Sequence, residues 1–229
     1  MAQAVILSGG MIDADFCSSY LTQIPQAVTI AADSGMRYFY STGQNPDWII
    51  GDFDSVDPKI LHYFEQQEDI SWIRLIPEKD DTDTEAAIRK AVELGCDTIH
   101  LLGATGSRLD HVLGNIQLLG IGFESGCSVI LADPHNRIRL IREPVCIRKC
   151  EQYGKYVSLI PFTPQVTDLT LKGMKYPLDH YNMQCFNSLG VSNEITDEEA
   201  EIAFSDGILL LLETADDPWK PEREWNSPE

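Results

Sequence analysis

The first part of the chain, up to about residue 140, alternates short apolar runs with amphipathic stretches. Each run has about five residues and is almost continuously apolar, which is typical of strands covered on both faces. With the turn residues that follow them, the runs occupy 4–10, 27–35, 48–55, 72–78, 98–106 and 128–133. Between two runs, the segment 83–95 has its apolar residues on one helical face and ends at Gly95, a residue type favoured after helices. We predict right-handed βαβ units around a mostly parallel, Rossmann-like sheet.

After about residue 140 the pattern changes to apolar and polar positions that alternate with a period of two, as in half-buried strands. Segments of this kind occupy 137–141, 155–162, 166–173, 183–190 and 199–214, and none of them has a convincing helical period. The tripeptide 205–207 (Ser-Asp-Gly) joins two such runs and predicts a hairpin turn. We therefore expect an α/β catalytic domain over 1–140 and an antiparallel β-sandwich domain over 141–229.

Charge narrows the choice of ligands. The chain has 17 Lys and Arg residues against 36 Asp and Glu residues, a formal net charge of -19. This balance argues against nucleic acid or an anionic membrane as a partner. If the chain handles polyphosphates, a divalent cation must supply much of the positive charge.

The N-terminal residues AQAVILSGGMID include neither a basic start nor a long apolar run, so we expect a cytoplasmic location. The six cysteines form no CxxC pair and are spread through apolar stretches. We expect them to be free, buried thiols.

The motif GDFDS, residues 51–55, follows an apolar run. In an extended segment Asp52 and Asp54 lie on the same side, so both carboxylates can face one cation, and an open pair of this kind suits Mg²⁺. The alternative is structural: an Asx-turn followed by a helix that Ser55 or Asp57 caps.

The motif EKDDTDTEAA, residues 78–87, follows another strand and begins a helix that Asp80 or Thr82 can cap. Acidic residues in a first helical turn complement the helix dipole, and this alone can explain the cluster. Lys79 is unusual there, since a lysine between a strand end and a helix N-terminus is well placed to meet a phosphate.

The Gly-rich turn GATGSRLDH, residues 103–111, precedes a helix and matches neither the P-loop nor the full dinucleotide fingerprint. Gly103 and Gly106 allow a ligand to approach the backbone closely, and Arg108 can bind a phosphate through two hydrogen bonds. Asp110 can hold that arginine or reach the metal. Asp33, in AADSG, ends another strand, and in open α/β sheets ligands bind beyond the carboxyl ends of the strands.

Taken in order, the motifs AADSG, PDWIIGDFDS, EKDDTD and GATGSRLDH closely resemble those of the thiamine pyrophosphokinase family. The likeness continues through LTLKGMKYPL, GVSNE and DGILLLLET and covers nearly the whole chain. The resemblance implies transfer of a diphosphate group from ATP to the hydroxyethyl oxygen of thiamine, giving thiamine diphosphate and AMP. It also implies a homodimer in which thiamine lies between the first domain of one subunit and the second domain of its mate.

The resemblance also implies which residues act. Its metal and phosphate carboxylates fall on Asp33, Asp52, Asp54 and Asp83, while Asp80 and Thr82 complete its DxTD pattern. Its Arg and Asp of the Gly-rich turn fall on Arg108 and Asp110, its thiamine-side element on Ser192 and Asn193, and a stacking aromatic on Trp219, which could equally be a solvent-side anchor. The candidate catalytic residues are thus Asp52, Asp54, Asp80, Asp83 and Arg108. The candidate metal ligands, for Mg²⁺, are Asp33, Asp52, Asp54 and Asp83. The candidate ATP- and thiamine-binding residues are Lys79, Thr82, Arg108, Asp110, Ser192, Asn193 and Trp219.

Two other functions stay open at this stage. DFDSV after an apolar strand loosely imitates the opening of haloacid dehalogenase phosphatases, in which the first aspartate, here Asp52, is a nucleophile. A module that binds a nucleotide or thiamine without turnover is the non-enzymatic alternative.

Overall fold

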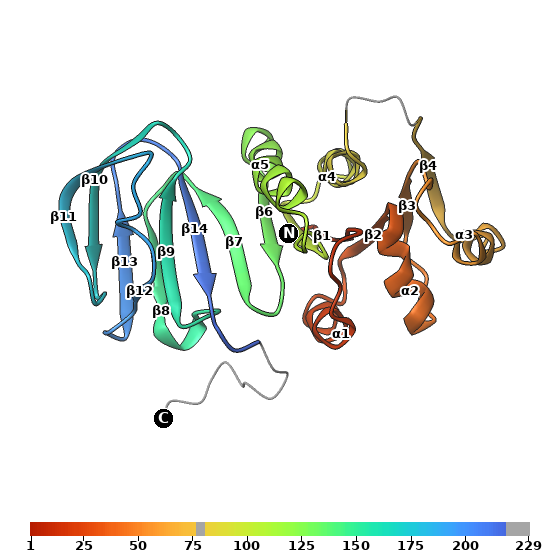
Figure 1. Cartoon of the computed structure of the whole chain (residues 1–229), viewed down its shortest axis with the longest axis horizontal. Helices are drawn as coiled ribbons and strands as arrows, with labels where there is room; N and C mark the ends of the chain where they lie inside the picture. The colour runs from red at the N-terminus through yellow and green to blue at the C-terminus, as the bar shows by residue number, and fades with distance from the viewer. Residues whose placement is uncertain (77–80, 219–229) are drawn as a thin grey trace. The chain divides into compact units, whose positions relative to one another are not determined.

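The computed structural model describes residues 1–76 and 81–218. The chain divides into two compact units, and the boundary along the sequence falls between Asp133 and Pro134 (Figure 1). Each unit is described by itself. The sequence placed this boundary after residue 140. The structure instead assigns strand β7 (Asn136–Ile141) to the second unit, where it pairs with the distant strand β14 (Leu209–Thr214). A pairing across so many residues leaves no trace in the local pattern.

The first unit is built on a parallel sheet. Its strands follow the spatial order β6-β5-β1-β2-β3-β4, and every neighbouring pair is parallel, which confirms the predicted mostly parallel fold. The order changes direction at β1, and in such sheets the ligand crevice lies beyond the carboxyl ends of the strands at this point. The strands are β1 (Gln3–Leu7), β2 (Val28–Ala32), β3 (Trp48–Gly51), β4 (Ser71–Arg74), β5 (Thr98–Leu102) and β6 (Ser128–Ala132).

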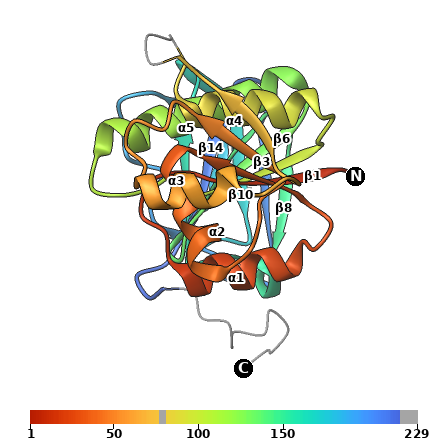
Figure 2. The same cartoon turned by 90° about the vertical axis from the view of Figure 1, so that its right-hand side faces the viewer.

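Helices cover both faces of this sheet. Figures 1 and 2 show α4 and α5 on one side and α1 and α2 on the other, and α3 packs against α2. The helices are α1 (Ala14–Gln23), the short 3₁₀ turn η1 (Asp33–Gly35), α2 (Met36–Thr42), α3 (Pro58–Glu65), α4 (Asp83–Glu93) and α5 (Leu109–Ser125). Thr82 caps α4, and Gly95 follows it with a φ of 75°, as the sequence predicted. Asp57, rather than Ser55, caps α3.

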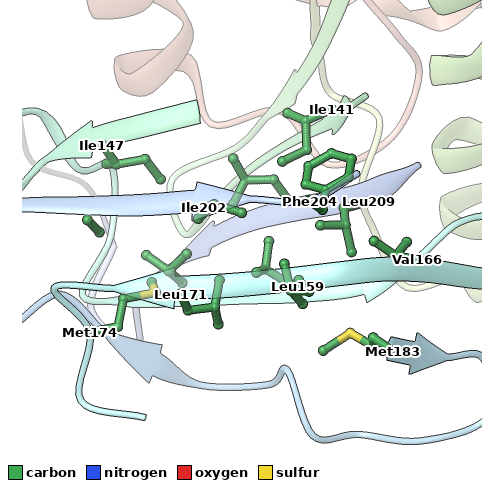
Figure 3. Close-up of a cluster of buried hydrophobic side chains, with 14 of the residues drawn as sticks. Ile141, Ile147, Leu159, Val166, Leu171, Met174, Met183, Ile202, Phe204 and Leu209 are labelled. Carbon is green, nitrogen blue, oxygen red and sulfur yellow. The ribbon is translucent and has the colours of Figure 1, made fainter. Parts of the chain in front are cut away.

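The second unit is a sandwich of two antiparallel sheets, as predicted. On one side, the strands of this unit follow the order β12-β9-β14-β7, and the sheet on the other side has the order β11-β10-β13-β8. Apolar side chains from both sheets meet between them, among them Leu159 and Leu209 from one and Leu171 and Ile202 from the other (Figure 3). Each fully buried aliphatic side chain contributes about 1.5–3 kcal/mol to such a core. The elements not yet given are β8 (Val145–Arg148), η2 (Lys149–Glu151), β9 (Tyr156–Pro161), β10 (Gln165–Lys172), β11 (Leu178–Gln184), β12 (Asn193–Glu194) and β13 (Glu199–Ala203).

The predicted hairpin at 205–207 is wrong. Strands β13 and β14 flank this turn but belong to different sheets, β13 pairing with β8 and β10 and β14 with β7 and β9. The turn therefore carries the chain from one sheet of the sandwich to the other, with Gly207 at a φ of 103°. A hairpin and a corner between sheets use the same turn residues, so the sequence alone does not separate them.

The six cysteines are free, as expected, but not all are buried. Cys17 and Cys96 lie in the core, whereas Cys146 and Cys150 are exposed. On β8 the side chains of Cys146 and Ile147 point to opposite faces of the sheet, so Cys146 lies outside the core in which Ile147 is buried. Within 1–76 and 81–218, none of the helices combines the length and apolarity needed to cross a lipid bilayer.

Candidate active site

Glycines let the loops at the carboxyl edge of the parallel sheet pack backbone against backbone. A Cβ atom at Gly35 would lie 1.8 Å from the carbonyl oxygen of Leu7, and one at Gly51 would lie 3.1 Å from the Cα atom of Asp33. No larger residue fits at Gly35 without a shift of the backbone. Side chains that follow β1, β2 and β3 are therefore brought together at one edge.

Three carboxylates converge there. Asp33 follows β2, Asp52 follows β3 and Asp83 opens α4, and one oxygen of each lies within 4.8 Å of the others. All three side chains are half-buried. The Oδ1 atom of Asp33 is buried and has no hydrogen-bond partner among the described residues. Three clustered carboxylates repel one another unless a cation lies between them, and carboxylate oxygens are the donors that Mg²⁺ prefers.

Asp54 is not part of this group, in contrast to the sequence expectation. Strand β3 ends at Gly51, and Phe53 has a left-handed φ of 64°, so the segment is not extended and the alternation argument fails. The backbone N–H of Asp54 donates to Oδ1 of Asp52 over 3.3 Å, and the Asp54 side chain is exposed. The structure thus forms the Asx-type turn that was the alternative interpretation of this motif.

The start of α4 is tied to the rest of the edge by hydroxyl groups. The Thr82 side chain accepts a hydrogen bond from the Glu85 N–H at 3.1 Å, and Thr84 shares a hydrogen bond of 2.8 Å with Ser8, which is buried at the end of β1. These bonds fix the helix turn that carries Asp83. Lys79 and Asp80 lie outside the described residues.

The Gly-rich turn packs against the turn after β1. The N–H of Gly10 donates to the carbonyl of Gly103 at 2.7 Å, and a Cβ atom at Gly10 would lie 2.4 Å from the carbonyl oxygen of Thr105. Gly103 has a φ of 63°, which glycine adopts without strain. Asn115, from α5, donates its side-chain N–H to the carbonyl of Ala104 at 2.7 Å. These bonds hold the turn in shape, and its residues Ser107 and Arg108 are exposed.

Arg108 precedes the first turn of α5 and pairs with Asp110. Its Nη2 atom lies 2.6 Å from Oδ2 of Asp110, and both side chains are about two-thirds exposed, at 69% and 66%. The hydrogen bond from Arg108 holds the pKa of Asp110 below its ordinary value and raises the pKa of Arg108. Of the two roles that the sequence left open for Asp110, the structure has the one in which it holds the arginine.

In the second unit, Ser192 and Asn193 lie where the chain enters β12. Ser192 has a φ of 61° and an exposed side chain, and its N–H donates to the Ser158 hydroxyl at 2.9 Å. Asn193 is buried, and its amide pairs with both backbone groups of Tyr176, at 2.9 and 2.8 Å. The Asn193 side chain therefore holds the 174–176 segment in place. Trp219 lies outside the described residues.

Sequence reasoning missed the roles of Ser8, Thr84 and Asn115, and it considered Ser55 only as a helix cap. The side chains of all four hold the loops in place. Ser55 and Thr84 lie within motifs already singled out, and Ser8 directly follows a strand, so these positions were the available signal. Their bonds run between loops that are distant in sequence, and only the assembled sheet reveals them.

Comparison with known proteins identifies relatives over almost the whole chain. The family model described as "Thiamin pyrophosphokinase, catalytic domain" matches residues 22–131, and that described as "Thiamin pyrophosphokinase, vitamin B1 binding domain" matches residues 144–209. The thiamine pyrophosphokinase of Bacillus subtilis is 33% identical over 187 residues, which cover 82% of this chain and 87% of the relative.

Solved structures of the same family are similar to this chain over nearly its whole length. The crystal structure of the Bacillus subtilis thiamine pyrophosphokinase has a TM-score of 0.83 and 32% identity, covering 93% of this chain and 99% of that one. The thiamin pyrophosphokinase of Geobacillus thermodenitrificans has a TM-score of 0.79 and 28% identity, covering 94% and 98%.

The fold, the carboxylates at the strand ends and these matches define a kinase-type diphosphotransferase. More particularly, the chain belongs to the thiamine pyrophosphokinase family, the enzymes that transfer the diphosphate group of ATP to thiamine and release AMP.

Proposed function

We propose that this chain makes thiamine diphosphate and AMP from thiamine and ATP, with Mg²⁺ held by Asp33, Asp52 and Asp83. The observation that supports this metal assignment is the convergence of the three carboxylates within 4.8 Å. Mg²⁺ is usually held by a few carboxylates together with water and substrate phosphates, and a half-buried, open group of this kind suits it. The buried Asp33 Oδ1 atom, without a partner among the described residues, fits a role as a ligand.

Charge explains why the enzyme needs a metal. The chain carries a net charge of -19, and ATP brings further negative charge to an edge that already holds three carboxylates. When bound, Mg²⁺ would neutralise phosphate charge and make the β-phosphorus more electrophilic. Lys79 and Arg108 would neutralise the charge that develops on the phosphates, and the backbone N–H groups at the start of α5 are suited to bind a phosphate oxygen.

The remaining candidates would support this site. Thr82 caps the helix that carries Asp83, and Asp110 keeps the guanidinium of Arg108 oriented. Asp54 is exposed beside Asp52 and would reach the phosphates or a second cation through solvent. Asp80 is proposed as a catalytic residue on the family resemblance alone.

We also propose that two copies of the chain form a homodimer, with thiamine between the first domain of one and the second domain of the other. Ser192, Asn193 and Trp219 would form the thiamine side. The match of 144–209 to a vitamin B1 binding domain supports this role for the second domain. Near Ser192, the side chains of Phe186, Leu189 and Val191 are exposed, and apolar groups in such number often mark an interface.

The dimer predicts a mass in solution. Light scattering on the purified chain should give about twice the chain's 25.6 kDa. Phe186→Ser, which removes a fully exposed apolar side chain, should shift the distribution towards the monomer at low protein concentration. A mass of one chain at all concentrations would contradict the dimer.

Release of AMP tests the reaction. With ATP, Mg²⁺ and thiamine, the chain should form AMP and thiamine diphosphate in equal amounts, whereas omission of thiamine or addition of EDTA should stop both. Phosphate release without thiamine would favour the phosphatase alternative, and binding of thiamine without turnover would favour the sensing module. Either result would overturn the proposal.

The cytoplasmic location expected from the sequence stays a prediction, which cell fractionation can check. The free state of the six cysteines is compatible with a reducing compartment, where disulfides are rare.

A further inference from the structure

Ser55 links the two neighbouring loops that carry the carboxylates. It lies in the loop after β3, and its hydroxyl donates a hydrogen bond of 2.6 Å to Oδ2 of Asp33, in the loop after β2. The two residues are 22 positions apart in the chain. This bond therefore connects the placement of Asp33 to the loop that begins with Asp52.

A local structural role does not account for this hydroxyl. Helix α3 begins shortly after Ser55, but Asp57 is its N-cap and accepts from the N–H of Lys59 at 2.9 Å. The turn itself is closed by Asp52, which accepts from the N–H of Asp54. These two backbone donors thus have other acceptors, and the Ser55 hydroxyl is directed at a carboxylate.

Asp33 needs such a bond to keep its direction. The backbone of Asp33 has a left-handed φ of 46°, which a non-glycine residue keeps only where the surrounding packing enforces it. Here the backbone at Gly35 packs directly against the carbonyl of Leu7 and holds the segment in place. The Asp33 side chain still rotates, and the charges of Asp52 and Asp83 within 4.8 Å favour rotation away from them. The Ser55 hydroxyl holds Oδ2 and leaves Oδ1 buried and without a partner among the described residues.

We infer that Ser55 is a positioning residue, whose hydroxyl orients the Asp33 carboxylate for the cation that Asp33, Asp52 and Asp83 bind. The inference rests on the proposed metal assignment and extends it to a residue outside the proposed group of ligands. Partners that orient a metal ligand in this way commonly change metal affinity by about 10- to 100-fold when they are removed.

Binding of Mn²⁺ alone, in place of Mg²⁺ and without nucleotide, tests the inference directly. Free Mn²⁺ can be followed by electron paramagnetic resonance during a titration of the full chain. Ser55→Ala should weaken Mn²⁺ binding about tenfold, while Ser55→Thr, which keeps the hydroxyl, should stay within about threefold of the natural chain. Ser41→Ala is the matched control, since it also removes a serine hydroxyl with one hydrogen bond, here of 2.8 Å to the Tyr38 carbonyl in α2. It should bind Mn²⁺ unchanged.

A kinetic measurement separates positioning from general damage. In Ser55→Ala the Mg²⁺ concentration for half-maximal activity should rise about tenfold, and excess Mg²⁺ should restore most of the rate. The KM for thiamine should not change. Loss of activity that excess Mg²⁺ does not restore, or equal losses in the Ala and Thr variants, would overturn the inference.

Two variants distinguish the metal assignment from the role of Ser55. If Asp83→Asn binds Mn²⁺ as well as the natural chain does, the metal assignment itself is wrong, and the role of Ser55 is refuted with it. If Asp83→Asn weakens binding and Ser55→Ala leaves it unchanged, the metal site stands and only the positioning role is refuted.

Discussion

Asp52→Asn and Asp83→Asn each reduce the rate of AMP formation by about a thousandfold, on the order of 4 kcal/mol of transition-state stabilisation. The substitution keeps the size of the side chain and removes its charge. The cluster of three carboxylates, whose oxygens lie within 4.8 Å of one another, therefore loses one anionic ligand. Steady-state assays at saturating ATP and thiamine measure the change. The variants keep their fold and their melting temperature does not fall, because removal of one of three neighbouring negative charges relieves repulsion.

Asp81→Asn is the matched control for this loss. Asp81 lies two residues before Asp83, is exposed, and has its carboxylate 3.8 Å from the guanidinium of Arg89. Removal of its charge breaks only a surface contact, so the rate should stay within about twofold. Near-normal turnover in either Asp52→Asn or Asp83→Asn, or an equal loss in Asp81→Asn, would refute the assignment of the metal ligands.

Most members of the carboxylate cluster could be predicted from the sequence, because their convergence follows from the geometry of a parallel sheet. Asp33 and Asp52 directly follow apolar runs, and the carboxyl ends of parallel strands share one edge. Asp83 was harder to place, since acids in a first helical turn have a sufficient explanation in the helix dipole. The packing of α4 against β1, β2 and β3, together with the hydrogen bond between the Ser8 and Thr84 hydroxyls, brings Asp83 to the others.

Asp54 shows where local reasoning failed. The alternation of side chains holds only along an extended backbone, and the left-handed φ of Phe53 breaks it. A non-glycine residue in this conformation is uncommon and leaves no sign in the hydrophobic pattern. Ser55 was considered as a helix cap, and its actual partner, Asp33, comes from another loop. Both errors concern geometry that the packed strand ends impose.

Membership of the family also bears on the phosphatase alternative. In that alternative Asp52 is a nucleophile that attacks phosphorus. The chain instead matches thiamine pyrophosphokinases along both units. In the first unit the Gly-rich turn lies at the carboxyl edge of the parallel sheet. Such an edge suits diphosphate transfer, which depends on positioning of the substrates and neutralisation of phosphate charge.

Glu213→Ala destabilises the second unit by about 3 kcal/mol, because it removes the buried carboxylate that pairs with the guanidinium of Arg137, whose side chain is only 23% exposed. Glu213 is completely buried and accepts two hydrogen bonds from Arg137, at 2.7 and 2.9 Å, and one from the N–H of Tyr153 at 3.0 Å. A second arginine, Arg139, lies two residues after Arg137 on β7. Burial lowers the pKa of Arg139, and the charge of Glu213 works against this shift. Urea unfolding followed by circular dichroism measures the loss.

Glu201→Ala provides the comparison within the same sandwich. Both glutamates face a basic residue directly across a pair of antiparallel strands, Glu213 opposite Arg137 and Glu201 opposite Lys172. The pairs differ in burial, since the Lys172 and Glu201 side chains are 65% and 42% exposed. Water screens the exposed pair, so its loss should change stability by about 0.5 kcal/mol or less. Equal losses in the two variants would mean that the register of the strands, rather than the burial of the charge, determines the contribution of each pair.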